Sequence, residues 1–278
     1  MQTIINKLLQ SPLFRLVYWF IRAPFSCYAA FAFYKEKTAR DLRTNGEYRV
    51  RFGPYKGMKY LKHGSSISLN CLLGSYEMEI WPVLESVKNE NYELIIDVGC
   101  AEGYHACGLA MITGKLVLAY DTSEIARDDC RLMAKVNGLA DQIQVGDYLS
   151  AEKLNSICSE KKVFLFCDID YHEMQLLDQQ KASSLEFTDI LVETHGRAPG
   201  SEDDTLPLLL SRFSETHEIQ IYTMNARWPY ELWQFVDKSD DYRFAIGKVI
   251  DEPLCHAFFE ERGWNNWLWM RSRKNIVE

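Results

Sequence analysis

The chain has 278 residues, which is enough for one large α/β domain with a substantial core and an extension. Its composition, 47% hydrophobic and 25% charged, is ordinary for a globular protein that dissolves in water. The formal net charge of -8 argues against a broad nucleic-acid-binding surface.

The eight cysteines are scattered along the chain and include no C-x-x-C pair. This distribution is typical of small core residues in a reducing compartment, rather than of a disulfide framework or a zinc site. We therefore expect a cytoplasmic protein.

Residues 1–44 are more basic and more apolar than the rest of the chain, with seven Lys and Arg against two Asp and Glu. Arg15 and Arg22 interrupt the apolar run 13–22, so it is not a clean membrane span. We predict an N-terminal helical extension that precedes a domain over 45–278. We favour a helix whose apolar face covers that domain or pairs with a second copy. Peripheral contact with an anionic membrane surface stays open as the alternative.

The domain is expected to begin with two small features before its main sheet. Alternating residues from 48 to 52, a Gly53-Pro54 turn and a second apolar stretch predict a small hairpin over 47–62. A helix then follows from about residue 75 to 88, with a break or kink at Pro82.

The segment from residue 93 to 121 has the pattern of a nucleotide-binding βαβ unit. It reads ELIIDVGCAEGYHACGLAMITGKLVLAYD. Two short apolar runs flank a turn with Gly99 and Gly103 and a stretch of small, apolar residues. Strand, glycine turn, helix, strand and acid follow one another as in one half of a dinucleotide-binding fold.

The acids of this segment indicate which nucleotide it binds. A dinucleotide turn has the pattern G-x-G-x-x-G, because a pyrophosphate lies against bare backbone there. Here the pattern is D-x-G-x-x-x-G, with Asp97 before the turn and Glu102 inside it. These carboxylates would repel a pyrophosphate but suit S-adenosylmethionine (SAM), which has ammonium and sulfonium charges and no phosphate. Asp121 lies where an acid that binds the ribose hydroxyls of the cofactor is expected. Its position favours a SAM-binding site over the alternative, an α/β domain whose glycines serve only close packing.

Further apolar runs extend the unit to a predicted seven-stranded sheet. The runs expected to form strands are residues 94–96, 116–119, 143–145, 163–167, 190–192, 218–222 and 267–270. This order predicts a Rossmann-like α/β fold with helices on both faces of the sheet. The segment 223–264 is predicted to be an insertion over the acceptor site, although its aromatic residues are equally compatible with ordinary core packing.

Acids and histidines follow the fourth and fifth of these strands. A hydroxyl acceptor benefits from a nearby base, and His195 is the best candidate by its ordinary pKa, with Asp170 and Glu193 next. Asp168 and Asp170 would also suit Mg²⁺ or Ca²⁺. Because backbone, ligand or water can satisfy acids at strand ends, we assign no metal, and this question stays open.

Two motifs carry a resemblance to a known family. The sequence DVGCAEG from Asp97 to Gly103 resembles the first motif of class I SAM-dependent methyltransferases. More narrowly, D-x-D-x-x-E from Asp168 to Glu173, followed by E-T-H at 193–195, resembles the FkbM-type methyltransferases. Their usual pattern is closer to D-x-E-G-x-E, and here Asp170 replaces the Glu and Tyr171 the Gly.

The resemblance implies the methyltransferase form of the seven-stranded sheet and SAM as the cofactor. It also implies methyl transfer to a hydroxyl of a small molecule or glycan. A nucleic-acid methyltransferase would have a turn like N-P-P-Y after the fourth strand, which the acidic sequence there lacks, so we expect no nucleic-acid partner. The alternative function is a noncatalytic SAM-fold binding or scaffolding protein, held at a membrane or a partner by its N-terminal helix.

The resemblance also implies roles for individual residues. In this family the helix before the first strand closes over the methionine end of SAM, and an acid after the third strand contacts the adenine amino group. The cofactor-binding residues that we expect are Tyr76, Glu77, Asp97, Gly99, Cys100, Ala101, Glu102, Gly103, Asp121, Thr122, Asp147 and Asp168. The expected catalytic residues are His195, Asp170 and Glu193.

Overall fold

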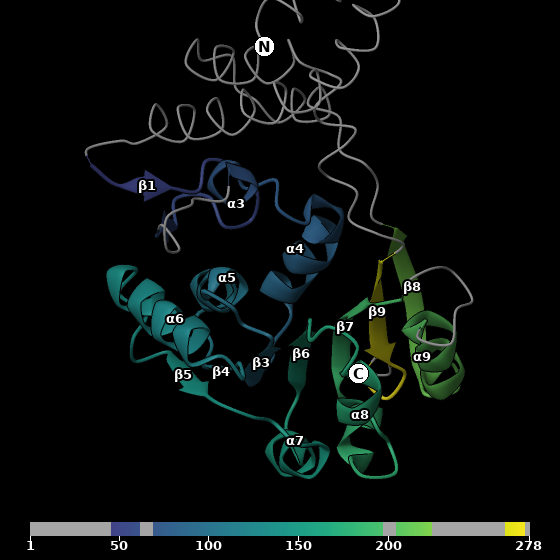
Figure 1. The fold of residues 1–278 in the computed structure, drawn as a ribbon. Helices are drawn as coiled ribbons and strands as arrows, with labels where there is room; N and C mark the ends of the chain where they lie inside the picture. The colour runs from purple at the N-terminus through teal and green to yellow at the C-terminus, as the bar shows by residue number, and fades with distance from the viewer. Residues whose placement is uncertain (1–45, 62–68, 197–203, 224–264, 276–278) are drawn as a thin grey trace, which may run out of the picture. The chain divides into compact units, whose positions relative to one another are not determined.

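The protein is described from a computed structural model, which defines residues 46–61, 69–196, 204–223 and 265–275 (Figure 1). These residues all belong to one unit of the chain. The predicted N-terminal extension 1–44 and, apart from Thr223, the predicted insertion 223–264 lie outside the described residues.

A seven-stranded sheet with the strand order β5-β4-β3-β6-β7-β9-β8 forms the centre of this unit. Its strands are β3 (Leu94–Val98), β4 (Val117–Tyr120), β5 (Ile143–Gly146), β6 (Val163–Cys167), β7 (Asp189–Thr194), β8 (His217–Thr223) and β9 (Asn266–Ser272). The strands from β5 to β7 in this order run parallel, and β9 is antiparallel to both of its neighbours. Every run that the sequence predicts to be a strand forms one, and the predicted Rossmann-like sheet is confirmed.

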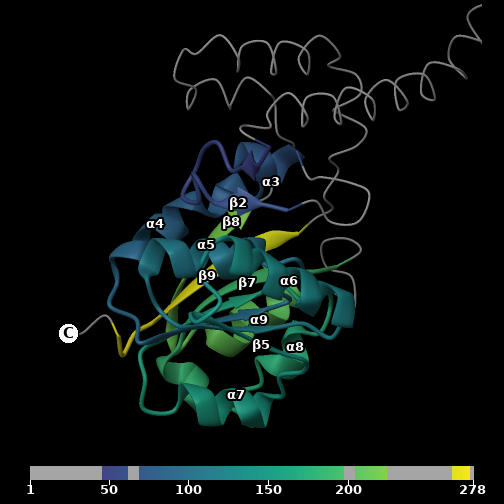
Figure 2. The same cartoon turned by 90° about the vertical axis from the view of Figure 1, so that its left-hand side faces the viewer.

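Helices cover both faces of the sheet, as predicted (Figure 2). One face carries α4 (Trp81–Asn89), α5 (Tyr104–Thr113) and α6 (Glu124–Val136), and the other carries α7 (Ala151–Cys158), α8 (Glu173–Leu176) and α9 (Thr205–Phe213). Shorter helices are α3 (Leu69–Leu73), η1 (Met78–Ile80) and η2 (Ser183–Phe187). Ser123, Ser150 and Asp204 begin α6, α7 and α9 because each side chain accepts a hydrogen bond from the first turn of its helix.

The two central strands, β3 and β6, are buried along their whole length. Their nearly continuous apolar sequences are those of parallel strands with helices on both faces. Asp97 is the exception, because it is fully buried and lies opposite Phe166 in the register. The fold therefore places a carboxyl group inside an apolar layer.

A short antiparallel ladder lies before the main sheet. In it β1 (Tyr48–Arg49) pairs with β2 (Lys59–Tyr60), within the segment for which the sequence predicts a hairpin. Asn137, at the end of α6, holds this ladder: its side chain accepts a hydrogen bond from the Lys59 amide at 2.7 Å and donates one to the Lys59 carbonyl at 2.9 Å. Pro82 lies in the first turn of α4, so the predicted break is a helix start.

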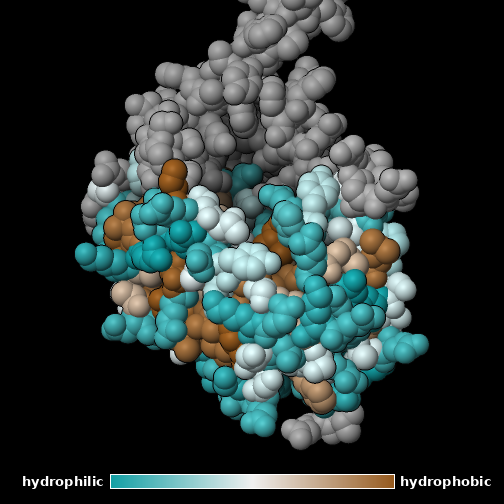
Figure 3. All heavy atoms as spheres, turned by 60° about the horizontal axis from the view of Figure 1, so that its bottom comes forward, coloured by the Kyte–Doolittle hydropathy of each residue, from teal (hydrophilic) through white to brown (hydrophobic). Residues whose placement is uncertain are grey.

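The described surface is mixed in character. The face shown in Figure 3 is largely hydrophilic, with apolar side chains in separate patches. Large apolar residues that are exposed come from several elements: Met111, Leu116, Ile125, Leu132, Tyr148, Tyr171, Phe187, Leu208 and Ile221. Within the described ranges, no helix has the length and apolar character needed to cross a membrane.

Candidate active site

A cavity of about 800 Å³ opens at the carboxyl ends of the parallel strands. The chain passes from β3 to β4 on one side and later returns to β6 on the other, and open α/β sheets bind ligands at such a reversal of strand order. The residues that line the cavity are Tyr76, Val98, Gly99, Ala101, Tyr120, Asp121, Thr122, Asp147, Tyr148, Leu149, Asp168, Ile169, Asp170, His172, Gln175, Glu193, His195 and Asn265.

The glycine turn after β3 fits closely against the end of β6. Gly99 has a φ of +86°, and a Cβ atom there would lie 1.6 Å from the Asp168 carbonyl oxygen. Only glycine therefore lets the two strand ends approach each other this closely. Gly103, with a φ of +92°, precedes α5 and turns the chain into that helix.

Asp121 joins this turn to the end of β4. Its Oδ2 accepts a hydrogen bond from the Ala101 amide at 3.0 Å, and its Oδ1 accepts one from the Ser123 amide at 2.8 Å. Each carboxylate oxygen has a further lone pair, so Asp121 can also accept hydrogen bonds from two hydroxyls of a ligand. Thr122 follows it and lines the same part of the cavity.

Asp147 lies at the end of β5 and is exposed to solvent at the cavity. The Tyr148 amide donates a hydrogen bond to its Oδ1 at 2.7 Å. This bond holds the pKa of Asp147 below its ordinary value. The neighbouring apolar side chains Leu149 and Ile169 also line the cavity, so Asp147 is a charged group beside a surface on which a flat ring could pack.

Several residues expected to bind the cofactor lie outside the cavity lining. Asp97 is fully buried behind it, and neither carboxylate oxygen has a hydrogen-bond partner among the described residues. Burial raises the pKa of Asp97 to about 7. Glu102 accepts a hydrogen bond from the Tyr60 hydroxyl at 2.9 Å. Cys100 and Gly103 belong to the turn itself, and their predicted contacts with a cofactor stay predictions.

Glu77 is also buried and pairs with His105 of α5, where its Oε2 lies 2.7 Å from His105 Nε2. The Tyr55 hydroxyl lies 3.1 Å from the other ring nitrogen, and the ring stacks on Phe166 with 4.4 Å between centroids. Burial lowers the pKa of His105, but the charge and hydrogen bond of Glu77 outweigh it, and the pKa is raised. Tyr76 packs beside this pair and reaches the cavity.

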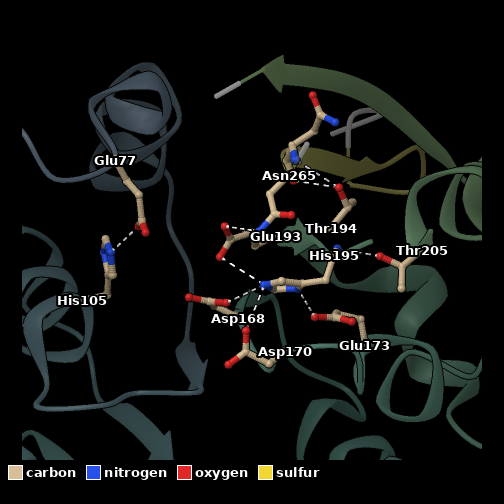
Figure 4. A network of polar contacts seen from close by, with 11 residues as sticks. Glu77, His105, Asp168, Asp170, Glu173, Glu193, Thr194, His195, Thr205 and Asn265 are labelled. Atoms are coloured by element: carbon tan, nitrogen blue, oxygen red, sulfur yellow. Dashed lines mark hydrogen bonds and ion pairs between the residues drawn. The ribbon is translucent and has the colours of Figure 1, made fainter. Parts of the chain in front are cut away.

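His195 is the centre of a second polar cluster, which Figure 4 shows facing the Glu77 pair. Its Nδ1 lies 2.6 Å from Glu173 Oε1. Around its Nε2 stand Asp170 Oδ1 at 3.3 Å, Asp168 Oδ1 at 3.6 Å and Glu193 Oε2 at 3.6 Å. Motifs from the ends of two adjacent strands are thus brought together at one end of the cavity.

Thr205 holds the backbone of His195 and Glu173 holds its ring. The His195 amide donates a hydrogen bond to Thr205 Oγ1 at 2.9 Å, and the Thr205 amide donates one to the His195 carbonyl at 2.9 Å. Glu173, the first residue of α8, is fully buried beneath the ring. Burial lowers the pKa of His195, but Glu173, Asp168 and Asp170 together raise it above its ordinary value.

The backbone beside this cluster adopts a conformation that favours glycine. Asp170 has a φ of +43° and Tyr171 a φ of +72°. Tyr171 stands where the FkbM-type pattern has Gly, and its ring lies 5.5 Å from that of His195. The left-handed backbone costs about 1–2 kcal/mol for each residue other than glycine, and such strain is often found at functional sites.

Many of the residues that line the cavity were predicted from the sequence, and others were not. Predicted site residues in the lining are Tyr76, Gly99, Ala101, Asp121, Thr122, Asp147, Asp168, Asp170, Glu193 and His195. The sequence did not predict the apolar wall, His105 as the partner of Glu77, or Asn265, whose side-chain amide donates a hydrogen bond to Glu193 Oε1 at 3.3 Å. Glu173 closes the D-x-D-x-x-E motif, so its position was a signal for its part in orienting His195.

The ionisable side chains that line the cavity are mostly acidic. It includes the five carboxylates of Asp121, Asp147, Asp168, Asp170 and Glu193, and the imidazoles of His172 and His195. No Lys or Arg belongs to the lining formed by the described residues. Such a cavity attracts cations and repels phosphates.

No protein-family model and no curated protein matches the sequence. Among solved structures, the chain is similar to a SAM-dependent methyltransferase from Geobacter sulfurreducens in complex with S-adenosyl-L-homocysteine. The identity is 14% and the TM-score 0.42, over 70% of this chain and 89% of that chain. For a SAM-dependent methyltransferase from Thiobacillus denitrificans, also in complex with S-adenosyl-L-homocysteine, the values are 15% and 0.43, over 71% and 92%.

A third similar structure is the O-methyltransferase from Bacillus cereus in complex with S-adenosyl-L-homocysteine. Its identity is 16% and its TM-score 0.41, over 51% of this chain and 72% of that chain. At such low identities and TM-scores, the ligands and activities of these proteins do not carry over to this chain.

Proposed function

We propose that this chain is a methyltransferase that uses SAM as its cofactor and methylates a hydroxyl of a small molecule or glycan. The observation that carries the proposal is the cavity at the reversal of strand order, lined by five carboxylates and, among the described residues, by no Lys or Arg. Phosphate-bearing cofactors are disfavoured there, whereas the sulfonium and ammonium groups of SAM are attracted.

The cavity offers a partner for each part of SAM. Asp121 would accept hydrogen bonds from the ribose hydroxyls, and Asp147 would accept one from the adenine amino group. Leu149 and Ile169 would pack against the adenine ring. Tyr76 would lie toward the methionine end, and the buried Asp97 carboxyl would ionise more readily beside a cation bound there.

The His195 cluster would then meet the acceptor. In the reaction the acceptor oxygen forms a bond to the methyl carbon while the bond from that carbon to sulfur breaks. Sulfur takes the electron pair and becomes a neutral thioether, and the hydroxyl proton leaves. Alignment and the exclusion of water contribute most to such a displacement, and a group that handles the proton adds to it. His195, Asp170 and Glu193 are the candidates for that part.

An FkbM-like assignment is supported by where its motif residues lie. Asp168, Asp170 and Glu173 come from one motif and Glu193 and His195 from the other, and all of them meet around one imidazole ring. This juxtaposition is what a shared task at the acceptor would require.

A transfer assay tests the proposal. The full-length chain would be incubated with SAM carrying a labelled methyl group and with panels of sugars, phenols and other alcohols. We expect label in a methyl ether, and the product S-adenosylhomocysteine in equal amount. SAM binding without transfer to any acceptor would instead support the noncatalytic binding protein, and a chain that binds no SAM would be no methyltransferase.

A further inference from the structure

We propose that Asp168, Glu193 and His195 form a binding site for a divalent transition-metal ion. Each residue offers one ligand atom, and these atoms all lie within 4.8 Å of one another. The ion would bind between the ends of β6 and β7, on the side that faces the cavity.

The distances within this cluster fit ligands of a common ion. Nε2 of His195 lies 3.6 Å from Asp168 Oδ1 and 3.6 Å from Glu193 Oε2. Such distances are too long for hydrogen bonds. Tetrahedral bonds of about 2.0–2.2 Å to a central ion place two ligand atoms about 3.3–3.6 Å apart. The two separations from Nε2 therefore match edges of a coordination shell, and the ligand atoms of the two carboxylates lie within 4.8 Å of each other.

The orientation of His195 is a second and independent observation. Its side chain is 6% exposed, and Nδ1 is held by Glu173, which lies in α8 and is itself fully buried. Metal-binding histidines usually donate the other ring N–H to a carboxylate in this way, which directs the remaining nitrogen lone pair at the ion. Within the described residues Nε2 makes no hydrogen bond, and it points at the carboxylates (Figure 4).

A bound cation would also stabilise the carboxylates of this cluster. Asp168 is half-buried, with 28% of its side chain exposed, Glu193 is 5% exposed, and both lie beside one imidazole. Buried carboxylates are costly unless a positive charge or hydrogen bonds compensate them. Among the described residues that line the cavity, no Lys or Arg stands beside the Asp168 carboxylate.

The donor set indicates the kind of ion. Mg²⁺ and Ca²⁺ are usually bound by oxygen atoms alone, whereas an imidazole with two carboxylates suits Mn²⁺, Fe²⁺ or Zn²⁺. The role of the ion rests on the proposed function: it would bind the acceptor oxygen and lower the pKa of the hydroxyl. His195 would then be a ligand, and the exposed carboxylate of Asp170 would take the proton.

The experiment is an Mn²⁺ titration of the full-length chain after removal of metals by a chelator and dialysis. Electron paramagnetic resonance would follow the signal of free Mn²⁺, and calorimetry would follow Zn²⁺ and Mg²⁺ in separate samples. We expect one Mn²⁺ or Zn²⁺ per chain and weaker binding of Mg²⁺. Glu173→Gln should weaken Mn²⁺ binding about 10–100-fold, as loss of an outer partner does, and His195→Gln and Asp168→Asn by more.

Asp147→Asn is the matched control, because it removes a carboxylate from the same cavity but not from the cluster. It should bind Mn²⁺ like the unchanged chain. Absence of Mn²⁺ and Zn²⁺ binding to the unchanged chain would overturn the proposal, and so would equal binding by His195→Gln. If a variant does not fold, Asp168→Glu is used in its place. This change keeps the negative charge but moves the carboxylate away from its position in the cluster. SAM calorimetry on the same samples separates the two proposals, because SAM binding without ion binding removes only the ion site.

Discussion

At the scale of single residues, Asp97 lies in an environment that is unfavourable for its charge. Its carboxyl group is fully buried between apolar strands, and in the part of the chain that the structure describes neither oxygen has a hydrogen-bond partner. Burial raises its pKa to about 7. A residue in such a position costs stability in the free protein, and a cationic ligand nearby would offset that cost.

The first prediction concerns Asp97→Asn. The folded-state pKa of about 7 lies above the ordinary value of 3.8, so the stability that the protonated form contributes is complete below pH 3.8 and is lost as the pH rises toward 7. Asparagine does not ionise. The free energy of unfolding of the variant minus that of the unchanged chain should therefore rise by on the order of a few kcal/mol between pH 4 and 7. Above pH 7 this difference should stay constant. Urea denaturation at several pH values measures this, and a difference that does not vary with pH would contradict it.

A second prediction concerns the left-handed backbone at Tyr171. Both Tyr171→Gly and Tyr171→Ala remove the ring from His195, but only glycine relieves the positive φ of 72°. Glycine should therefore be the more stable variant by about 1 kcal/mol, although alanine is usually the more stable of the two. Denaturant midpoints of the two variants decide the matter, and an alanine variant of equal or greater stability would show that the backbone there is unstrained.

At the scale of elements, the strands were predictable and most contacts between them were not. The apolar runs in β3 and β6 predict buried parallel strands, and the glycine turn predicts their link to α5. The pairing of Glu77 with His105 could not be predicted, because it depends on how α5 packs beside the chain ahead of α4. The same holds for Asn265, which has no motif of its own and reaches Glu193 only through the pairing of β9 with β7.

Motif residues are an intermediate case. D-x-D-x-x-E predicts carboxylates at the end of β6, and the strand order then brings them to His195. How many of these carboxylates lie near His195 Nε2 depends on the left-handed backbone at Asp170 and Tyr171. The sequence does not indicate that backbone, because a left-handed residue is usually Gly and position 171 is Tyr. The apolar lining, such as Leu149 and Ile169, was not predicted because apolar residues after a strand are usually core.

The third prediction tests the close contact between β3 and β6. In Gly99→Ala the new Cβ meets the backbone oxygen of Asp168, which has little freedom to move. Gly57→Ala is the control, because Gly57 also has a positive φ, of 93°, but a Cβ atom there would have no neighbouring atom within 4 Å among the described residues.

We expect Gly57→Ala to cost about 1–2 kcal/mol through backbone strain alone. Gly99→Ala should cost roughly 3 kcal/mol more, or prevent folding, because overlap adds to the strain. Thermal and urea unfolding of both variants measure the difference. Similar losses in the two would mean that the ends of β3 and β6 can separate without much cost.

At the scale of the whole molecule, strand order and charge act together. The doubly wound sheet gathers the ends of five parallel strands at one edge. Acids lie at the ends of four of these strands: Asp121, Asp147 and Asp168 directly after β4, β5 and β6, and Glu193 as the penultimate residue of β7. Residues distant in sequence thereby form one acidic cavity. The predictions for residues 1–44, a covering helix, a dimer contact or a membrane contact, concern a part of the chain outside the described residues and stay predictions.

We propose that this cavity binds a positively charged nucleoside, and calorimetry of the full-length chain with SAM measures that binding. We expect one SAM to bind per chain, and binding to be at least about 10-fold weaker in Asp121→Asn, where a charged acceptor of hydrogen bonds is lost. Asp141→Asn, which changes an exposed acid outside the cavity, should bind as the unchanged chain does. NAD⁺, with its pyrophosphate, should not bind. Binding of NAD⁺ in preference to SAM, or no binding of SAM, would show that the cavity is not a site for a positively charged nucleoside.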